Sequence, residues 1–209
     1  MFNFKEIHMK RLLCLYLSLF VFSTVSIAQT IDNHQRIRMS LTPNGLFRDS
    51  LSNSYAVIPF EGKNQTELYA MVLKNLHELY NSPKEVLSLF ENETITIYAQ
   101  TTKLAYDRVL GLTFAGQTYY KINIYFKDNK VKIDYPEISK ATFRPVDSDS
   151  EIIYQYPLLA STYFDKKGNV KKKRIGIVNA IEEYANWLCN YIIYGSKLIQ
   201  SESTKDNDW

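Results

Sequence analysis

The stretch QTYYKINIYFKDNKVKIDYPEI, residues 117–138, carries the strongest structural signal in the chain. Apolar residues alternate with other side chains on both sides of the pair Asp128-Asn129. A period of two is typical of β-strands, and such a polar pair between two strands is typical of a tight turn. The stretch therefore predicts an antiparallel hairpin of strands 117–127 and 130–138. One face of this hairpin carries the apolar set Tyr120, Ile122, Ile124, Phe126, Val131, Ile133 and Tyr135.

The opposite face of the predicted hairpin mixes aromatic and cationic side chains, because alternate residues of a strand point to opposite faces. Such a mixture suits stacking and cation-π contact with a sugar, a peptide or a partner protein. A solvated sheet face or a homodimer contact would carry similar residue types. The candidate partner-binding face consists of Tyr98, Tyr119, Lys121, Tyr125, Lys127, Lys130 and Lys132.

Two amphipathic helices are predicted, one before and one after the hairpin. Asn64 stands three residues before Glu67, the spacing of a capping box, and apolar residues at helical spacing follow until Pro83 stops them. A second helix is expected over residues 174–195, where apolar residues recur every three or four positions and Gly195 is placed to end it.

Three shorter stretches have the composition of strands, namely residues 55–60, 85–90 and 94–100. The last two flank a polar turn and predict a second hairpin. Together with the hairpin of residues 117–138 they give about five strands, which are grouped in the sequence and flanked by helices. This grouping is typical of an α+β protein with an antiparallel sheet, not of a doubly wound parallel one.

The first 28 residues have the layout of a secretory signal peptide. The basic pair Lys10-Arg11 precedes an apolar run over residues 12–27, and Ala28 before Gln29 offers a cleavage site. The run is short for a transmembrane span, which needs about 20 apolar residues. We therefore expect cleavage between Ala28 and Gln29, export to the periplasm or the outer surface, and no transmembrane anchor in the mature chain.

Removing the signal peptide changes the composition that bears on function. Taking 28 from 209 residues leaves 181, and three basic residues are lost against one acidic residue, so the net charge falls from +3 to +1. A nearly neutral chain lacks the electrostatic footprint of a nucleic-acid-binding protein. Of the two cysteines only Cys189 remains, which excludes an intrachain disulfide in the mature chain.

The sequence offers little that points to catalysis or to a cofactor. His34 and His77 have no second ligand at metal-binding spacing, and neither a phosphate-binding glycine loop nor a GxSxG string occurs. We expect Cys189 to be a packed thiol, although a dyad with His77 stays open at this point. The sequence therefore predicts no catalytic residue, no cofactor and no metal.

Two charged stretches are interpreted as solvated loops. The acidic string over residues 147–151 begins like a calcium loop, but Ile152 stands where the EF-hand loop needs glycine. The basic run over residues 171–174 suits contact with anionic lipid or polysaccharide, but a single short cluster binds weakly.

Three segments resemble a known protein family, namely LTPNGLF (41–47), YAVIPFEGKNQTELY (55–69) and LYNSPKEVLSLFENETITI (79–97). The family consists of exported Bacteroidota proteins classed as a domain of unknown function with a TBP-like fold, and the resemblance covers about residues 40–140. It implies a curved antiparallel sheet with two helices packed on one face. It brings no catalytic residues, and the fold by itself does not imply DNA binding.

We expect a non-catalytic binding or assembly module of the bacterial envelope, whose partner is an envelope protein, a peptide, a glycan or a second copy of the chain. The alternative is an envelope hydrolase that uses an acidic pair, either Glu91 with Glu93 or Asp147 with Asp149. The expected parts are a signal peptide (1–28), an N-terminal arm (29–53), the TBP-like α+β core (54–140), an irregular acidic and basic connection (141–173), a packing helix (174–195) and a polar tail (196–209).

Overall fold

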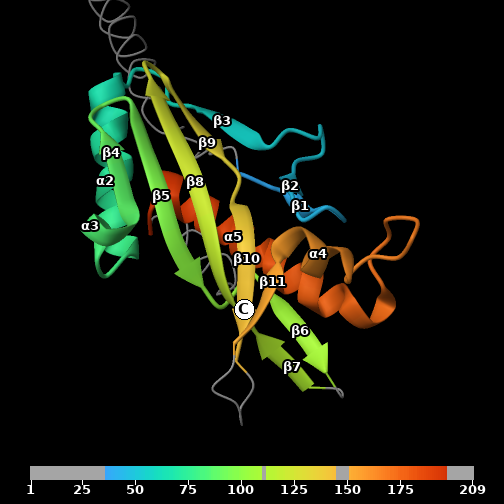
Figure 1. The fold of residues 1–209 in the computed structure, drawn as a ribbon. Coiled ribbons are helices and arrows are strands. Elements are labelled where there is room, and N and C mark those ends of the chain that lie inside the picture. Colours follow the sequence, from blue (N-terminus) through green and yellow to red (C-terminus); the bar gives the residue numbers. More distant parts are fainter. Residues whose placement is uncertain (1–35, 110–111, 145–150, 197–209) are drawn as a thin grey trace, which may run out of the picture. The chain divides into compact units, whose positions relative to one another are not determined.

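The computed structural model of the 209-residue chain describes residues 36–109, 112–144 and 151–196 (Figure 1). Several features expected from the sequence lie outside these residues. They are the signal peptide with its cleavage site at Ala28 and Gln29, the beginning of the arm with His34, the acidic residues Asp147 and Asp149, and the tail from residue 197 onward.

A seven-stranded antiparallel sheet forms the centre of the fold (Figure 1). Five strands follow one another across it in the order β11-β10-β8-β5-β4, and β9 with β3 branches off beside β8. The predicted antiparallel α+β class is thereby confirmed. The strands are β3 (Tyr55–Pro59), β4 (Leu87–Phe90), β5 (Thr94–Thr101), β8 (Gln117–Lys127), β9 (Lys130–Asp134), β10 (Glu137–Phe143) and β11 (Ile152–Gln155).

The long strand β8 makes the sheet curl, because two strands share one of its sides. β10 pairs with its first half and β9 with its second half, while β5 lies along the other side. The chain passes from β9 to β10 at Tyr135-Pro136, where proline has no N–H for the ladder. The strand predicted over residues 130–138 is for that reason two strands that diverge.

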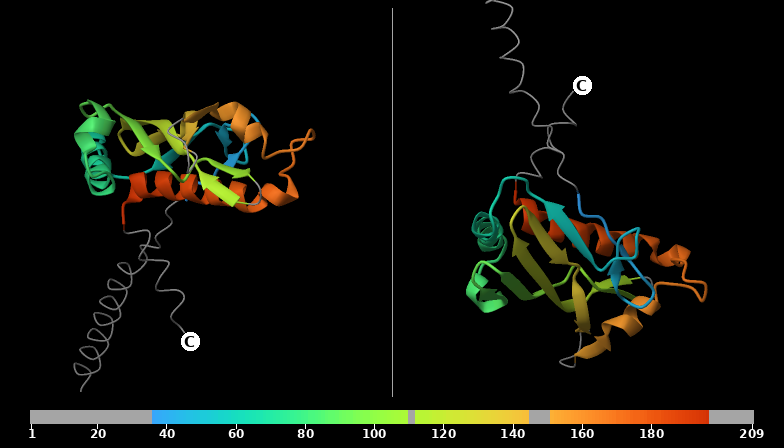
Figure 2. Two further views of the ribbon diagram at one scale, coloured as in Figure 1. Left: turned by 60° about the horizontal axis from the view of Figure 1, so that its bottom comes forward. Right: turned by 90° about the horizontal axis from the view of Figure 1, so that it is seen from above.

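The two long helices, α2 (Gln65–Leu79) and α5 (Ile175–Tyr194), lie where the sequence predicts helices. The capping box is confirmed, since the Asn64 side chain accepts from the Glu67 N–H and the Glu67 carboxylate accepts from the Asn64 N–H, each at 2.9 Å. Figure 2 shows α5 running along one side of the sheet, and α2 packs on both α5 and β8.

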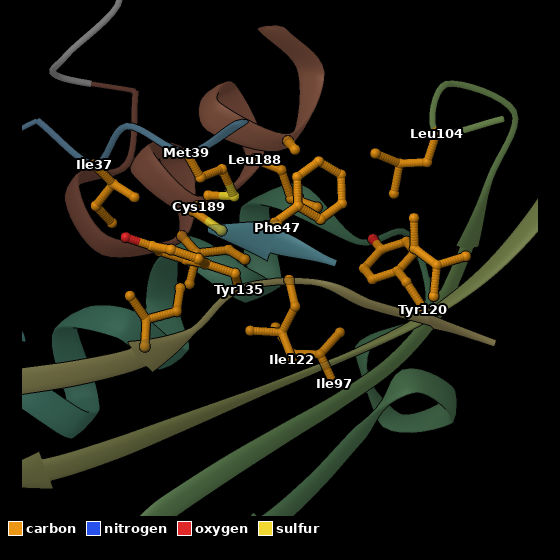
Figure 3. Packing of buried hydrophobic residues seen from close by; sticks show 14 of the residues in the cluster. Ile37, Met39, Phe47, Ile97, Leu104, Tyr120, Ile122, Tyr135, Leu188 and Cys189 are labelled. Atoms are coloured by element: carbon orange, nitrogen blue, oxygen red, sulfur yellow. The ribbon is translucent and has the colours of Figure 1, made fainter. Parts of the chain in front are cut away.

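The hydrophobic core fills the space between the sheet and these helices (Figure 3). Leu188 and Cys189 of α5 are fully buried, as are Ile97 of β5 and Ile122 of β8. All seven apolar residues assigned from the sequence to the inner face of the 117–138 hairpin are buried. The alternation read from the sequence therefore sets the inner face of the sheet correctly.

The segment from Arg36 to Leu41 lies extended against α5, and we call it the strap. Its odd-numbered residues Ile37, Met39 and Leu41 are buried in the core. It continues into a small hairpin of β1 (Ser40–Leu41) and β2 (Phe47–Arg48). Within the stretch expected to be a leading arm, residues from Arg36 onward thus contribute to the core.

Side chains of α5 hold the backbone of the strap at Ile37, Met39 and Leu41, and a neighbouring strand, β2, pairs with it at Ser40 and Leu41. The side-chain amide of Asn190 bonds both the N–H and the carbonyl of Ile37, at 3.0 and 2.9 Å. Asn186 bonds Met39 in the same way at 2.7 and 3.0 Å, and Glu182 accepts from the Leu41 N–H at 2.8 Å. Helical residues four apart lie on one face, so these three side chains match alternate residues of an extended chain.

Further elements lie in stretches that the sequence leaves irregular. Residues 85 and 86, expected in a strand, belong to a helical turn, because Pro83 suits the first turn of a helix. Tyr163 connects two distant stretches, since its hydroxyl donates to the Tyr106 carbonyl at 2.5 Å and accepts from the Tyr106 N–H at 3.2 Å. The elements are α3 (Pro83–Val86), β6 (Tyr106–Val109), β7 (Leu112–Ala115), α4 (Tyr156–Ser161) and the 3-10 turn η1 (Lys172–Arg174).

Within the described residues, the helices are too short or too polar for one of them to cross a membrane.

Candidate functional site: the open face of the sheet

The sheet face that points away from α2 and α5 carries the residues proposed from the sequence. Tyr98, Tyr119 and Tyr125 expose 57%, 40% and 37% of their surface there, although large apolar rings are usually covered. Strand pairing fixes their neighbours, because Tyr98 lies opposite Lys121 and Tyr125 lies opposite Lys132. The open face is therefore an ordered array of aromatic and cationic groups on rigid strands.

Cation-π contacts connect the lysines and the tyrosine rings of neighbouring strands. The Lys121 ammonium lies 5.7 Å from the centre of the Tyr98 ring. Lys132 lies between two rings, 4.7 Å from the centres of both Tyr55 and Tyr125. Each such contact at an exposed position contributes about 0.5–1 kcal/mol, so the lysines and rings hold one another in place.

A polar network occupies the middle of the open face. Thr96 donates to the Asn123 side chain at 3.1 Å, and Asn123 donates to the Asp134 carboxylate at 3.1 Å. Asp134 also pairs with Lys132 at 3.0 Å. The carboxylate of Asp134 is thus already engaged within the face and adds little free negative charge to it.

A hollow of about 620 Å³ lies at one end of the open face. This volume falls within the range of ligand-binding clefts, roughly 300–1,000 Å³. The walls combine two aromatic rings with groups of both charge signs. The side chains that line it include Tyr98, Tyr119, Lys121, Glu85, Glu137 and Ser139.

The structure separates the predicted residues into two groups. Tyr98, Tyr119 and Lys121 line the hollow, whereas the remaining four lie further along the sheet. Of these, Lys127 and Lys130 pair with each other next to the β8–β9 turn, and Tyr125 pairs with Lys132. One end of the face is therefore a hollow lined by aromatic rings and by groups of both charge signs, and the other end is a lysine-rich strip.

Two members of the face are missing from the sequence prediction. Tyr55 begins β3 and stacks with Lys132. Lys140 lies in β10, with its ammonium 4.7 Å from the centre of the Tyr119 ring. Tyr55 could have been found from the alternation in YAVIPF, whereas Lys140 lies beyond residue 138, where the predicted strand ends.

The residues considered for catalysis or metal binding are not brought together. Glu91 and Glu93 are exposed in the β4–β5 turn, and neither lines the hollow. Cys189 is fully buried, which raises the pKa of its thiol, while His77 is exposed on α2. Among the residues that the structure describes, no group of three or more His, Cys, Asp or Glu side chains is arranged to hold a metal ion.

A second concave region runs between the strap and α5, and we call it the α5 groove. Its volume is about 760 Å³. One wall is the strap with Arg36 and Arg38, and the other is the surface of α5 with Trp187 and Tyr191. Sequence reasoning missed this groove because it depends on the docking of the strap.

Glu182, which accepts a hydrogen bond from Leu41 of the strap, is expected to make the stability of the protein depend on pH. Burial raises the pKa of Glu182 above its ordinary value, and the hydrogen bond from Leu41 opposes this only in part. A group whose pKa is higher in the folded protein than in the unfolded chain stabilises the fold at pH values below its unfolded-state pKa. This stabilisation is lost as the pH rises through the folded-state pKa. We therefore expect Glu182→Gln, which keeps an accepting oxygen, to be more stable than wild type at about pH 7, with the difference shrinking toward about pH 4.

Urea unfolding of both chains at the two pH values measures this difference. A Glu182→Gln variant that is less stable at both pH values, or a difference that does not change with pH, would contradict the expectation.

No family model matches the chain, and no curated protein matches it. Two solved structures are similar to it, both from Bacteroidota. A TBP-like protein from Parabacteroides distasonis ATCC 8503 has 15% identity and a TM-score of 0.48, over 68% of this chain and 90% of that one. A DUF4468 family protein from Bacteroides ovatus ATCC 8483 has 12% identity and a TM-score of 0.48, over 65% of this chain and 80% of that one. The fold class of this chain rests on its own strands and helices.

Proposed function

We propose that the chain is an exported, non-catalytic binding module of the bacterial envelope, and that its open sheet face holds an acidic segment of a partner polypeptide. The observation that carries the proposal is the ordered array of tyrosines and lysines on β3, β5, β8, β9 and β10. The export part rests on the layout of residues 1–28.

Charge complementarity supports an acidic partner. Among the described residues, the strands of the face carry Asp134 and Glu137 as carboxylates, Glu85 adds a third at the hollow, and Asp134 is paired with Lys132. Electrostatic complementarity of this kind guides association and suppresses wrong partners. The lysines of the face are Lys121, Lys127, Lys130, Lys132 and Lys140.

The residues that line the hollow favour a polypeptide partner over a polymer that carries only negative charges. Its walls carry Glu85 and Glu137 beside Lys121, so a string of negative charges is repelled there. The rings of Tyr98 and Tyr119 instead suit a bulky side chain, because tyrosine gives large contact area at low cost in conformational entropy. A segment with acidic residues and an aromatic residue matches both ends of the face.

The probe for this proposal is a soluble random copolymer of glutamate and tyrosine, with polyglutamate and a copolymer of lysine and tyrosine as comparisons. We expect saturable binding of the glutamate and tyrosine copolymer, weaker binding of polyglutamate, and a loss of affinity with added salt. Isothermal titration calorimetry measures all three.

The double variant Tyr119→Ala/Tyr125→Ala should weaken binding of this copolymer at least tenfold, about 1.4 kcal/mol, while the fold persists. Trp187→Ala, which removes an exposed ring from α5 on the other side of the molecule, is the matched control and should bind as wild type does. Unchanged affinity of the double variant, with native circular dichroism, would remove the proposal. Tighter binding of a polyuronate than of the copolymer would point to a glycan on this face instead.

A further inference from the structure

The most basic stretch of the chain lies at the end of the molecule where α5 begins. Residues 165–174 hold six basic residues against one acidic residue, a net charge of +5, whereas the whole chain has a net charge of +3. We call this stretch the basic end. Figure 2 shows it projecting beyond the start of α5, at the end of the molecule opposite α2. The positive charge of the protein is therefore concentrated at one end.

A tight loop brings two groups of lysines together in the basic end. A bridge between Phe164 and Val170 closes the loop, and Asp165 accepts from the Asn169 N–H at 3.0 Å within it. The lysines at positions 166 and 167 are thus held next to the basic run that follows the loop. The patch consists of the exposed residues Lys166, Lys167, Lys171, Lys172 and Lys173. The structure thereby turns the short cluster seen in the sequence into a larger patch.

Carboxylates offset the charge of this patch only in part. Asp165 is the one acidic residue within the stretch 165–174. Asp107 of β6 reaches the stretch from outside, with its Oδ1 3.6 Å from Nη2 of Arg174. Counting both carboxylates at full charge against the six basic groups still leaves a net charge of +4. The first turn of α5 carries no acidic residue and adds the partial positive charge of a helix N-terminus.

Exposed apolar side chains stand next to these charges. Ile175 follows the basic run in the first turn of α5 and exposes 46% of its surface. Leu112 exposes 65% at the start of β7, and its neighbour Thr113 lines a hollow of about 550 Å³ together with Lys172 and Lys173. A soluble polyanion has no use for such apolar groups, whereas the boundary between the headgroups and acyl chains of a bilayer accepts both kinds of side chain.

We infer that the basic end is a docking surface for an anionic lipid bilayer, with its lysines at the lipid phosphates and with Leu112 and Ile175 at the edge of the acyl chains. Charge complementarity carries the inference, because about four to eight clustered basic residues are typical of surfaces that bind anionic lipids. The contact is peripheral, since the helices of the described residues are too short or too polar to cross a membrane. It does not depend on the function proposed for the sheet face.

The test uses vesicles of phosphatidylglycerol, which is anionic, and of phosphatidylcholine, which has no net charge. The chain is used from Gln29 onward, because the apolar run over residues 12–27 would bind lipid by itself. This form keeps every residue that the structure describes. Co-sedimentation with the vesicles measures binding. We expect saturable binding to phosphatidylglycerol that weakens with added salt, and no binding to phosphatidylcholine.

The double variant Lys166→Gln/Lys167→Gln should weaken binding to the phosphatidylglycerol vesicles about 25-fold, because each lysine near an anionic surface contributes about a factor of five in affinity. Lys63→Gln/Lys74→Gln is the matched control, since it removes the same charge from exposed positions at the end of the molecule that holds α2. This control should bind as wild type does. Equal weakening by both variants would mean that net charge alone attracts the chain, and would overturn the inference.

Leu112→Ser separates a bilayer from a soluble polyanion. It should weaken vesicle binding about fivefold, because an apolar side chain no longer enters the lipid, and should leave binding of dextran sulfate unchanged. Circular dichroism checks that each variant keeps the fold. The inference fails if phosphatidylglycerol vesicles are not bound, if both lipids are bound equally, or if Leu112→Ser keeps full vesicle affinity. The last result together with tight binding of dextran sulfate would assign the patch to a soluble polyanion.

Discussion

Gly195→Ala should lower the free energy of unfolding by about 3 kcal/mol, one of the two largest effects expected of a single substitution here. Gly195 ends α5 with φ of 69° and ψ of −162°, a conformation essentially limited to glycine. An added Cβ would also lie 2.6 Å from Oδ1 of Asn75. Asn75 is buried and donates to the Ile192 carbonyl at 3.0 Å and to the Ile193 carbonyl at 3.3 Å, so the clash disturbs the contact between α2 and the end of α5.

Gly176→Ala is the matched control, since Gly176 lies in the first turn of the same helix. A Cβ there meets no atom within 4 Å. Alanine is the better helix former by about 1 kcal/mol, so this variant should be as stable as wild type or slightly more stable. Urea unfolding followed by circular dichroism compares the two. Equal stability of the two variants would show that the end of α5 is not constrained as described.

Asn186→Ala should be similarly costly, by about 3 kcal/mol, because it leaves both backbone groups of Met39 without their partners. Asn186 also donates to the Glu182 carbonyl at 2.8 Å, which orients its amide toward the strap. The loss should loosen the strap and expose Ile37, Met39 and Leu41.

Amide hydrogen exchange measures this loosening, as faster exchange at Met39 with little change in β8. Asn179→Ala, an exposed position on the same helix, is the control and should change stability by less than about 0.5 kcal/mol. Unchanged exchange at Met39 in Asn186→Ala would mean that packing alone holds the strap.

The elements that the sequence predicts correctly have strong local signals. The helix α2 begins at a capping box formed by Asn64 and Glu67, which lie three residues apart. The inner face of β8 follows from strict alternation over eleven residues. Such signals need no knowledge of distant contacts, and they are enough to give the fold class.

The missed elements depend on contacts between distant residues. The strap looks like a polar arm, because its partners Asn186 and Asn190 lie about 150 residues further along the chain. The alternation of Ile37, Met39 and Leu41, and the spacing of Glu182, Asn186 and Asn190 by four, are the signals that could have revealed it.

Part of the candidate site on the open face could also be predicted from the sequence. Alternation in β8 places Tyr119, Lys121 and Tyr125 on the open face without any tertiary information. The hollow was not predictable, because Glu137 and Ser139 reach it only through the pairing of β10 with β8.

The most direct test of the proposed function is a map of where an acidic, tyrosine-containing polypeptide contacts the chain. Backbone amide chemical shifts would be recorded by NMR during a titration with the glutamate and tyrosine copolymer. We expect saturable changes at Tyr98, Tyr119, Lys121, Tyr125 and Lys132, with the exposed side of α2 unchanged. Changes confined to the α5 groove or to α2, or no changes at all, would contradict a binding role for the open sheet face.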